Sequence, residues 1–188
     1  MQRIFHNEYL MSLKNSTSTY GSITKILHWL IFLFVIVLLF VGYFAQDIGD
    51  KSIRSNIINM HKLLGLVVLF LMLFRALWVL VNVKPALPAE TPPWQRIIER
   101  IIHLLMYIVL IAMPISGWVM TSANRKPPHF FSWILSLPVP NSKSIGNNAW
   151  QVHQTIAIII IVLVSIHVLA AFYHYFIKKD NVLQRMLP

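Results

Sequence analysis

The sequence predicts an all-α protein, a four-helix transmembrane bundle. Hydrophobic residues make up 57% of the 188 residues and charged residues only 12%, with a mean hydropathy of +0.66. Soluble domains are usually about 45–50% apolar. Four apolar runs each reach about 20 residues, the length needed to cross a bilayer as a helix. Proline and polar residues gather between these runs, where connections are expected.

The four predicted spans are residues 26–45, 63–83, 101–121 and 150–177. The second is interrupted only by Arg75, and the third contains Pro114. Ser22, Ser55 and Asn148 precede three of the runs and are of the residue types that cap helices, so we expect caps there.

Residues 1–18 are polar and lack a clear period, so we expect a disordered N-terminal extension before a membrane domain at residues 19–188. Met11 begins a stretch that resembles a natural membrane-protein start, which gives the hypothesis that Met11 rather than Met1 is the initiator. Residues 26–45 are too long for the apolar core of a signal peptide.

The charge and cysteine content limit the classes of function. The formal net charge of +10 fits basic residues that flank membrane spans and meet anionic lipid, and this explains the charge better than nucleic-acid binding. The two ends and the middle connection hold nine basic residues against six in the two opposite loops, which predicts that both termini lie in the cytoplasm. The absence of cysteine excludes disulfides, thioether-linked haem, iron–sulfur clusters and thiolate zinc sites.

Histidines inside the apolar runs are the candidate ligands. His153 and His167 are fourteen residues apart in the last run, about 21 Å along a helix and on nearly the same face. With alternating helices, His28 falls at the depth of His167 and His61 at the depth of His153. Each pair comes from two different helices, as a clamp of two imidazoles on a haem iron requires. The sequence therefore predicts two b-type haems, with these four residues as axial iron ligands.

Other polar residues near the spans are candidates for supporting roles. Arg75 shares a helix face with His61 but lies about 21 Å deeper; it is a candidate contact of a haem propionate or quinone, with a snorkelling arginine as the alternative. His103 is a candidate hydrogen-bonding or quinone-side residue, with a satisfied core histidine as the alternative, and His174 is a weaker candidate for the same role. His6 and His129 are expected in solvent.

Several stretches of the chain, from about residue 19 to the end, resemble the bacterial cytochrome b561 family of four-helix, di-haem membrane proteins. They are Tyr20-Gly21, Leu27-His28-Trp29, His61-Lys62 through Gly65 to Arg75, His103 through Tyr107 and Pro114 to Gly117, Lys126-Pro127 with the loop to Pro138, Trp150 to His153, His167 to His174, and the ending Lys179-Asp180-Asn181-Val182-Leu183-Gln184-Arg185-Met186. The resemblance implies that residues matching His28 and His167 hold one haem b and those matching His61 and His153 the other.

The expected function is transmembrane electron transfer. Family members similar to superoxide oxidases imply superoxide as the donor at the outer face and ubiquinone as the acceptor. Basic residues that would attract the anion are Lys51, Arg54, Lys62, Arg125 and Lys126. The apolar loop 130–137 is expected to lie in the outer interface as a lid, or to be plain packing.

Two other functions are kept open. The alternative within the same fold is a cytochrome b membrane anchor that relays electrons for a partner dehydrogenase or hydrogenase. A histidine-lined metal transporter is disfavoured, because the predicted spans hold no carboxylate and the two histidine pairs are far apart.

Overall fold

A computed structural model describes residues 13–88 and 91–187. Four long helices dominate it: α2 (Ser22–Phe44), α3 (Lys51–Leu80), α4 (Pro93–Ala123) and α5 (Lys143–Phe172). A short 3₁₀ turn, Ala45–Asp47, follows α2, and a π-helical segment, Tyr173–Lys178, follows α5. Each of the four is long and apolar enough to cross a membrane, as predicted.

The N-terminal expectations concern a part of the chain that is only partly described. Residues 1–12, and with them the Met11 hypothesis, lie outside the described residues. Within the described remainder, the Asn15 side chain accepts hydrogen bonds from Gly21 N at 2.9 Å and Thr24 Oγ1 at 2.7 Å and donates to Val83 O at 2.8 Å. Asn15 thereby ties the approach to α2 to the end of α3.

The helices begin earlier than the apolar runs. Asp50 caps α3 by accepting from Ile53 N at 2.9 Å, and Ser142 caps α5 by accepting from Ile145 N at 3.4 Å. The caps expected at Ser55 and Asn148 are therefore wrong, and Ser22 is the first residue of α2 rather than its cap. Hydropathy marks only the part of a helix suited to hydrocarbon, whereas the hydrogen-bonded helix continues through polar turns beyond it.

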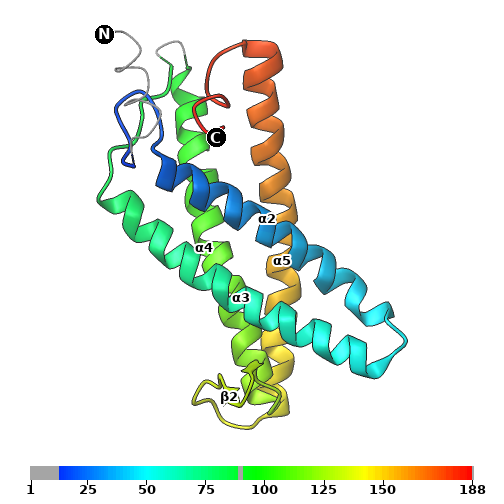
Figure 1. Ribbon diagram of the computed structural model, residues 1–188. Helices are drawn as coiled ribbons and strands as arrows, with labels where there is room; N and C mark the ends of the chain where they lie inside the picture. The colour runs from blue at the N-terminus through cyan, green and yellow to red at the C-terminus, as the bar shows by residue number, and fades with distance from the viewer. Residues whose placement is uncertain (1–12, 89–90, 188) are drawn as a thin grey trace.

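The helices pack as two antiparallel pairs (Figure 1). α2 and α3 lie side by side, and this pair crosses the pair formed by α4 and α5. α3 also packs on α4, but in the described part of the chain α5 has no extended backbone contact with α2 or α3. Side chains rather than close-packed backbones therefore join α5 to the first two helices.

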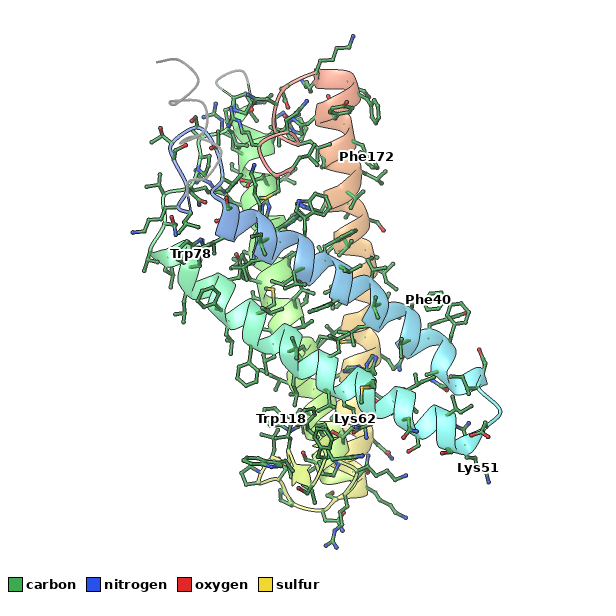
Figure 2. The ribbon with its side chains drawn as sticks, in the orientation of Figure 1. Phe40, Lys51, Lys62, Trp78, Trp118 and Phe172 are labelled. Carbon is green, nitrogen blue, oxygen red and sulfur yellow. The ribbon has the colours of Figure 1, made fainter. Side chains whose placement is uncertain are left out.

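A layer of aliphatic side chains fills the middle of the bundle. Its buried members come from all four helices: Ile31, Val35, Val68, Met72, Val109, Leu110, Ile160 and Leu163. Most other large apolar side chains point outward, as Phe40 does in Figure 2; it is 63% exposed, Phe70 64% and Leu104 61%. An apolar outer surface on four spanning helices is the surface of a multi-pass membrane protein.

The connection between α4 and α5 folds as a short hairpin, β1 (His129–Phe130) and β2 (Trp133–Ile134), antiparallel with Phe130 opposite Trp133. The buried Asn59 side chain of α3 donates to His129 O at 2.9 Å and accepts from His129 N at 3.1 Å. Trp118 Nε1 donates to Leu135 O at 2.8 Å. These bonds hold the hairpin against α3 and α4 at the end of the bundle opposite the C-terminal tail (Figure 1).

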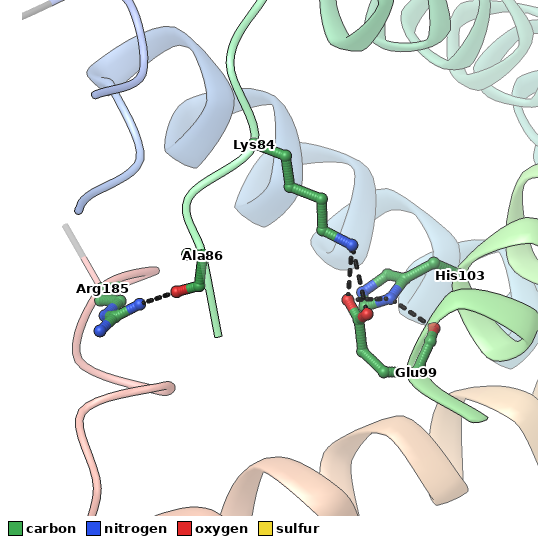
Figure 3. Close-up of polar contacts among 5 residues, drawn as sticks. All are labelled: Lys84, Ala86, Glu99, His103 and Arg185. Atoms are coloured by element: carbon green, nitrogen blue, oxygen red, sulfur yellow. Dashed lines mark hydrogen bonds and ion pairs between the residues drawn. The ribbon is translucent and has the colours of Figure 1, made fainter. Parts of the chain in front are cut away.

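The C-terminal tail turns back over the bundle. Lys179 adopts a left-handed conformation, φ 54°, directly after the π-helical segment and reverses the chain. Trp29 Nε1 then donates to Met186 O at 2.8 Å, and Arg185 donates to Ala86 O at 2.6 Å (Figure 3). The tail therefore lies beside the start of α2, next to His28.

Candidate haem sites

The structure brings together the same histidine pairs that depth along the helices predicted. The rings of His28 on α2 and His167 on α5 have their centroids 6.0 Å apart. The rings of His61 on α3 and His153 on α5 are 6.4 Å apart. The two pairs lie at different levels of the bundle, separated by the aliphatic layer.

The spacing within each pair fits a metal ion bound between two imidazoles. Two nitrogen–metal bonds of about 2 Å each, in line, put the ring centroids about 6 Å apart. The described residues contain no group of three or more His, Asp or Glu side chains that could hold a metal ion on their own. Each pair thus offers two axial ligands, and a planar macrocycle would supply the remaining ones.

The proton of His153 is fixed by its neighbours. Its Nδ1 lies 3.1 Å from Met113 O, which can only accept, and 3.0 Å from Ser116 Oγ. Nδ1 therefore carries the hydrogen, and Nε2 keeps a lone pair for a metal. His61 Nδ1 is buried and has no hydrogen-bond partner among the described residues. An unpartnered buried imidazole nitrogen is costly, and such a group is expected where a ligand belongs.

An apolar cavity lies between His61 and His153. Leu38, Leu110 and Pro114 are among its lining residues, together with Gly65. A Cβ added at Gly65 would meet nothing within 4 Å, so there is open space beside this glycine. A Cβ at Gly117 would lie 3.0 Å from His153 Cε1, so glycine is needed there for the ring to approach α4. The donor set and the apolar lining both fit a haem.

The surroundings of His28 and His167 are polar instead. The ring of His103 on α4 lies 5.3 Å from that of His167. His103 Nδ1 contacts Glu99 O at 2.8 Å and Glu99 Oε1 at 3.0 Å. The Glu99 carboxylate also accepts from Lys84 Nζ at 2.9 Å, as Figure 3 shows. A hydrogen-bonded line thus runs from Lys84 through Glu99 to His103.

Sequence reasoning missed Glu99 as part of this site. Glu99 precedes the apolar run at 101–121, so hydropathy places it outside the span, but α4 begins at Pro93 and includes it. The signal was present, because Glu99 and His103 are four residues apart and so share one helix face. The apolar runs thus hold no carboxylate, whereas the helix α4 does.

Arg75 and Tyr20 lie at the same end of the bundle. Arg75 donates to Thr24 O at 3.2 Å and is within electrostatic range of His28 and His167. Burial, reinforced by the charge of Glu99, raises the pKa of the Tyr20 hydroxyl, although Arg75 acts in the opposite direction. Tyr20 therefore stays neutral and can donate a hydrogen bond.

The remaining predicted residues lie apart from the two pairs. His174 Nδ1 is 2.6 Å from Asp180 Oδ2, so this ring is engaged by the C-terminal tail. The side chain of His129 is exposed, as expected, and His6 lies outside the described residues.

The basic residues expected to attract an anion are only partly brought together. Lys62, next to His61, donates to Lys126 O at 2.8 Å, so the α4–α5 connection reaches the His61 level. Lys51 lies at the far tip of α3, well away from Lys62 (Figure 2).

Three relatives are similar to this chain over most of its length. The chain is 28% identical to cytochrome b561 homolog 2 of Escherichia coli K12 over 179 residues, 94% of this chain and 95% of the relative. It is 28% identical to cytochrome b561 homolog 1 of the same strain over 166 residues, 86% of this chain and 93% of the relative. It is 26% identical to a probable superoxide oxidase CybB of Yersinia pestis over 167 residues, 86% of this chain and 92% of the relative.

The family model described as prokaryotic cytochrome b561 matches residues 19–188. This is nearly the whole chain and includes all four spans and both histidine pairs. The chain therefore belongs to the prokaryotic cytochrome b561 family, membrane proteins that transfer electrons through b-type haem.

Proposed function

We propose that this chain holds two b haems and carries electrons across the bacterial inner membrane, from superoxide at the outer face to ubiquinone at the inner face. The observation that carries the proposal is the pair of ring separations, 6.0 Å and 6.4 Å, at two levels of one bundle. His28 and His167 would hold one haem and His61 and His153 the other. The haems supply a one-electron carrier at each level.

The reaction joins a one-electron donor, superoxide, to a two-electron acceptor, ubiquinone. Two superoxide anions each give up one electron and leave as dioxygen. One ubiquinone takes up those two electrons and two protons and becomes ubiquinol. Two histidines on each iron would leave it no open position, so superoxide would give up its electron at the edge of the site.

The outer end has features that suit an anionic donor. Lys62 follows His61 in α3, and its hydrogen bond to Lys126 O holds its ammonium group in place. Lys126 itself is exposed on the same connection. Positive charge near the mouth of a low-dielectric site raises the local concentration of an anion and its rate of arrival. Lys51 is too distant to share this role.

The inner end has features that suit a quinone head group. His103 and Arg75 provide donors near His167 and His28, and Glu99 fixes the orientation of the His103 ring through Nδ1. Arg75 is also the residue to pair with a haem propionate. Reduction of ubiquinone also takes up protons, which would have to reach the head group from this end of the bundle. Titratable side chains lie there, Lys84 and Glu99 among them. The positive-inside bias supports a cytoplasmic location for this end.

The isolated protein tests the proposal. Purified protein with its haem, supplied with superoxide from an enzymatic source, should reduce a soluble ubiquinone, and superoxide dismutase should abolish the reaction. If the haem is reduced by a co-purifying dehydrogenase but not by superoxide, the chain is instead a membrane anchor that relays electrons for that enzyme. The probable superoxide oxidase among the relatives supports superoxide as the first donor to try.

A further inference from the structure

The α4–α5 hairpin carries an exposed apolar tip that the electron-transfer function does not use. The tip consists of Phe130, Phe131, Trp133 and Ile134, whose side chains are 56%, 87%, 74% and 71% exposed. These four large apolar side chains flank or occupy one two-residue turn, and the rings of Phe130 and Phe131 are in contact. Exposed apolar patches of this kind mark contact surfaces. The tip is therefore a surface that lacks its partner in the isolated chain.

The backbone of the turn supports a role for the side chain at its apex. Phe131 has φ 50°, in the left-handed region. Glycine or asparagine occupies this conformation at lower cost, and a bulky residue there is strained. Strain of this kind persists where the rest of the structure imposes it and clusters at functional sites. The apex thus presents an aromatic ring where chain reversal alone would favour a small residue.

The base of the hairpin is rigid, so the tip is held in one position. Asn59 clamps His129 through two hydrogen bonds, and Leu135 N donates to Pro128 O at 2.9 Å across the base. Pro128 is fully buried. A tip fixed in this way pays little ordering entropy when it meets its partner.

The membrane interface is the partner that the surroundings of the tip favour. The helix α4 ends at Ala123, six residues before β1. Trp118, on the last turns of that span, holds Leu135 of the hairpin through its indole nitrogen. Indole rings collect at the headgroup level of bilayers. The hairpin is therefore tied to the last turns of a spanning helix, where interfacial residues are expected.

Basic side chains at the two ends of the α4–α5 connection match the charge of lipid headgroups. Arg125 and Lys126 lie between α4 and β1, and Lys143 begins α5; all three are exposed. Aromatic rings with adjacent basic residues are the composition of interfacial anchors. Basic residues lie at the base of the hairpin and aromatic residues at its tip. This order suits a hairpin whose apex inserts into the lipid.

We propose that the hairpin tip inserts into the interface of the lipid leaflet at this end of the bundle and anchors the α4–α5 connection there. The anchor fixes the depth of the connection whose Lys126 carbonyl holds Lys62 beside His61. This inference stands on the membrane topology and does not depend on which donor or acceptor the haems serve.

The chain contains no cysteine, so a single introduced thiol reports one position without further changes. The test uses the full-length, haem-loaded protein in nanodiscs of phosphatidylethanolamine and phosphatidylglycerol. Phe131→Cys carries an environment-sensitive fluorophore that is challenged with iodide in water and with nitroxide-labelled lipid. Ser136→Cys is the exposed polar control in the same connection, and Leu104→Cys is the lipid-facing control on α4.

At position 131 we expect iodide quenching several-fold weaker than at 136, and quenching by the lipid nitroxide close to that at 104. Equal iodide quenching at 131 and 136 would mean that the tip stands in water and would overturn the proposal. Protection from both quenchers would mean that a second copy or another protein covers the tip, and would overturn it as well.

A second variant guards against a labelled protein that fails to fold. Trp133→Phe keeps an aromatic ring at the tip, and its haem spectrum reports folding. In brominated lipid this variant should lose part of the quenchable tryptophan fluorescence of the parent protein. An unchanged quenchable fraction in a correctly folded variant would contradict insertion.

Discussion

The two histidine levels are built from the same residue types but differ in their surroundings. Around His61 and His153 the lining is apolar, one imidazole proton is fixed by a backbone carbonyl, and Gly65 leaves open space. Around His28 and His167 there are instead a third imidazole and charged residues, with Glu99 at their centre. On the proposed function, the apolar level would only pass electrons, whereas the polar level would couple them to protons and a polar substrate.

The largest effect is expected when one histidine ligand is removed from either level. We expect His153→Ala and His167→Ala each to lose one of two haems, because the remaining imidazole of the pair cannot clamp the iron alone. Haem per chain, measured as the pyridine haemochrome, should fall by half in each variant. His129→Ala, which removes an exposed imidazole, is the matched control and should keep both. Retention of both haems in His167→Ala would refute the pairing.

Filling the open space should affect only the apolar level. Gly65→Leu places a side chain where nothing lies within 4 Å of a glycine Cβ and where the haem would sit, so we expect loss of the haem at the His61–His153 level alone. Gly49→Leu, at the other glycine with open space, is the control, since Gly49 lies outside the helices. The reduced-minus-oxidised spectrum distinguishes the two levels by comparison with the histidine variants. A Gly65→Leu protein with full haem content would place the haem elsewhere.

The spans and the histidine pairing could be predicted from the sequence, because hydropathy fixes depth and depth alone sorts His28 with His167 and His61 with His153. The caps Asp50 and Ser142 and the true start of α4 at Pro93 could not, because polar helical turns outside the hydrocarbon leave no hydropathy signal. Glu99 lies in such a polar turn, so hydropathy could not place it in the candidate site. The hairpin could not be predicted either, because its turn contains neither glycine nor asparagine, the residues that signal a tight turn.

The polar level can be tested through Glu99. In Glu99→Gln the charge-assisted bonds to His103 and Lys84 are weakened, a loss of about 1.5–3 kcal/mol if they position the acceptor. We expect ubiquinone reduction to slow by about tenfold or more, with haem content and reduction of the haem by superoxide unchanged. Stopped-flow measurement separates the two steps.

Asp180→Asn provides the comparison, because Asp180 holds His174 as Glu99 holds His103. We expect this variant to reduce ubiquinone at the parent rate. If Asp180→Asn is the slower of the two, the head group lies at His174 and the assignment to His103 is wrong.

The smallest expected effect concerns the basic residues at the apolar level. Lys62→Gln removes one positive charge beside His61, and we expect about a twofold fall in the rate of haem reduction by superoxide at low ionic strength. The difference from the parent should vanish at high salt, where charges are screened. Lys51→Gln, at the distant tip of α3, should have no effect; an equal loss in both variants would show that overall charge rather than Lys62 matters.

The number of b haems per chain is the most direct test of the central claim, that the two histidine levels are two haem sites. Protein purified from haem-replete cells, quantified by amino-acid analysis and by the pyridine haemochrome, should contain two haems b per chain. A value of one at saturation, or none, would contradict the account, because one of the two matched pairs would then have no ligand to hold.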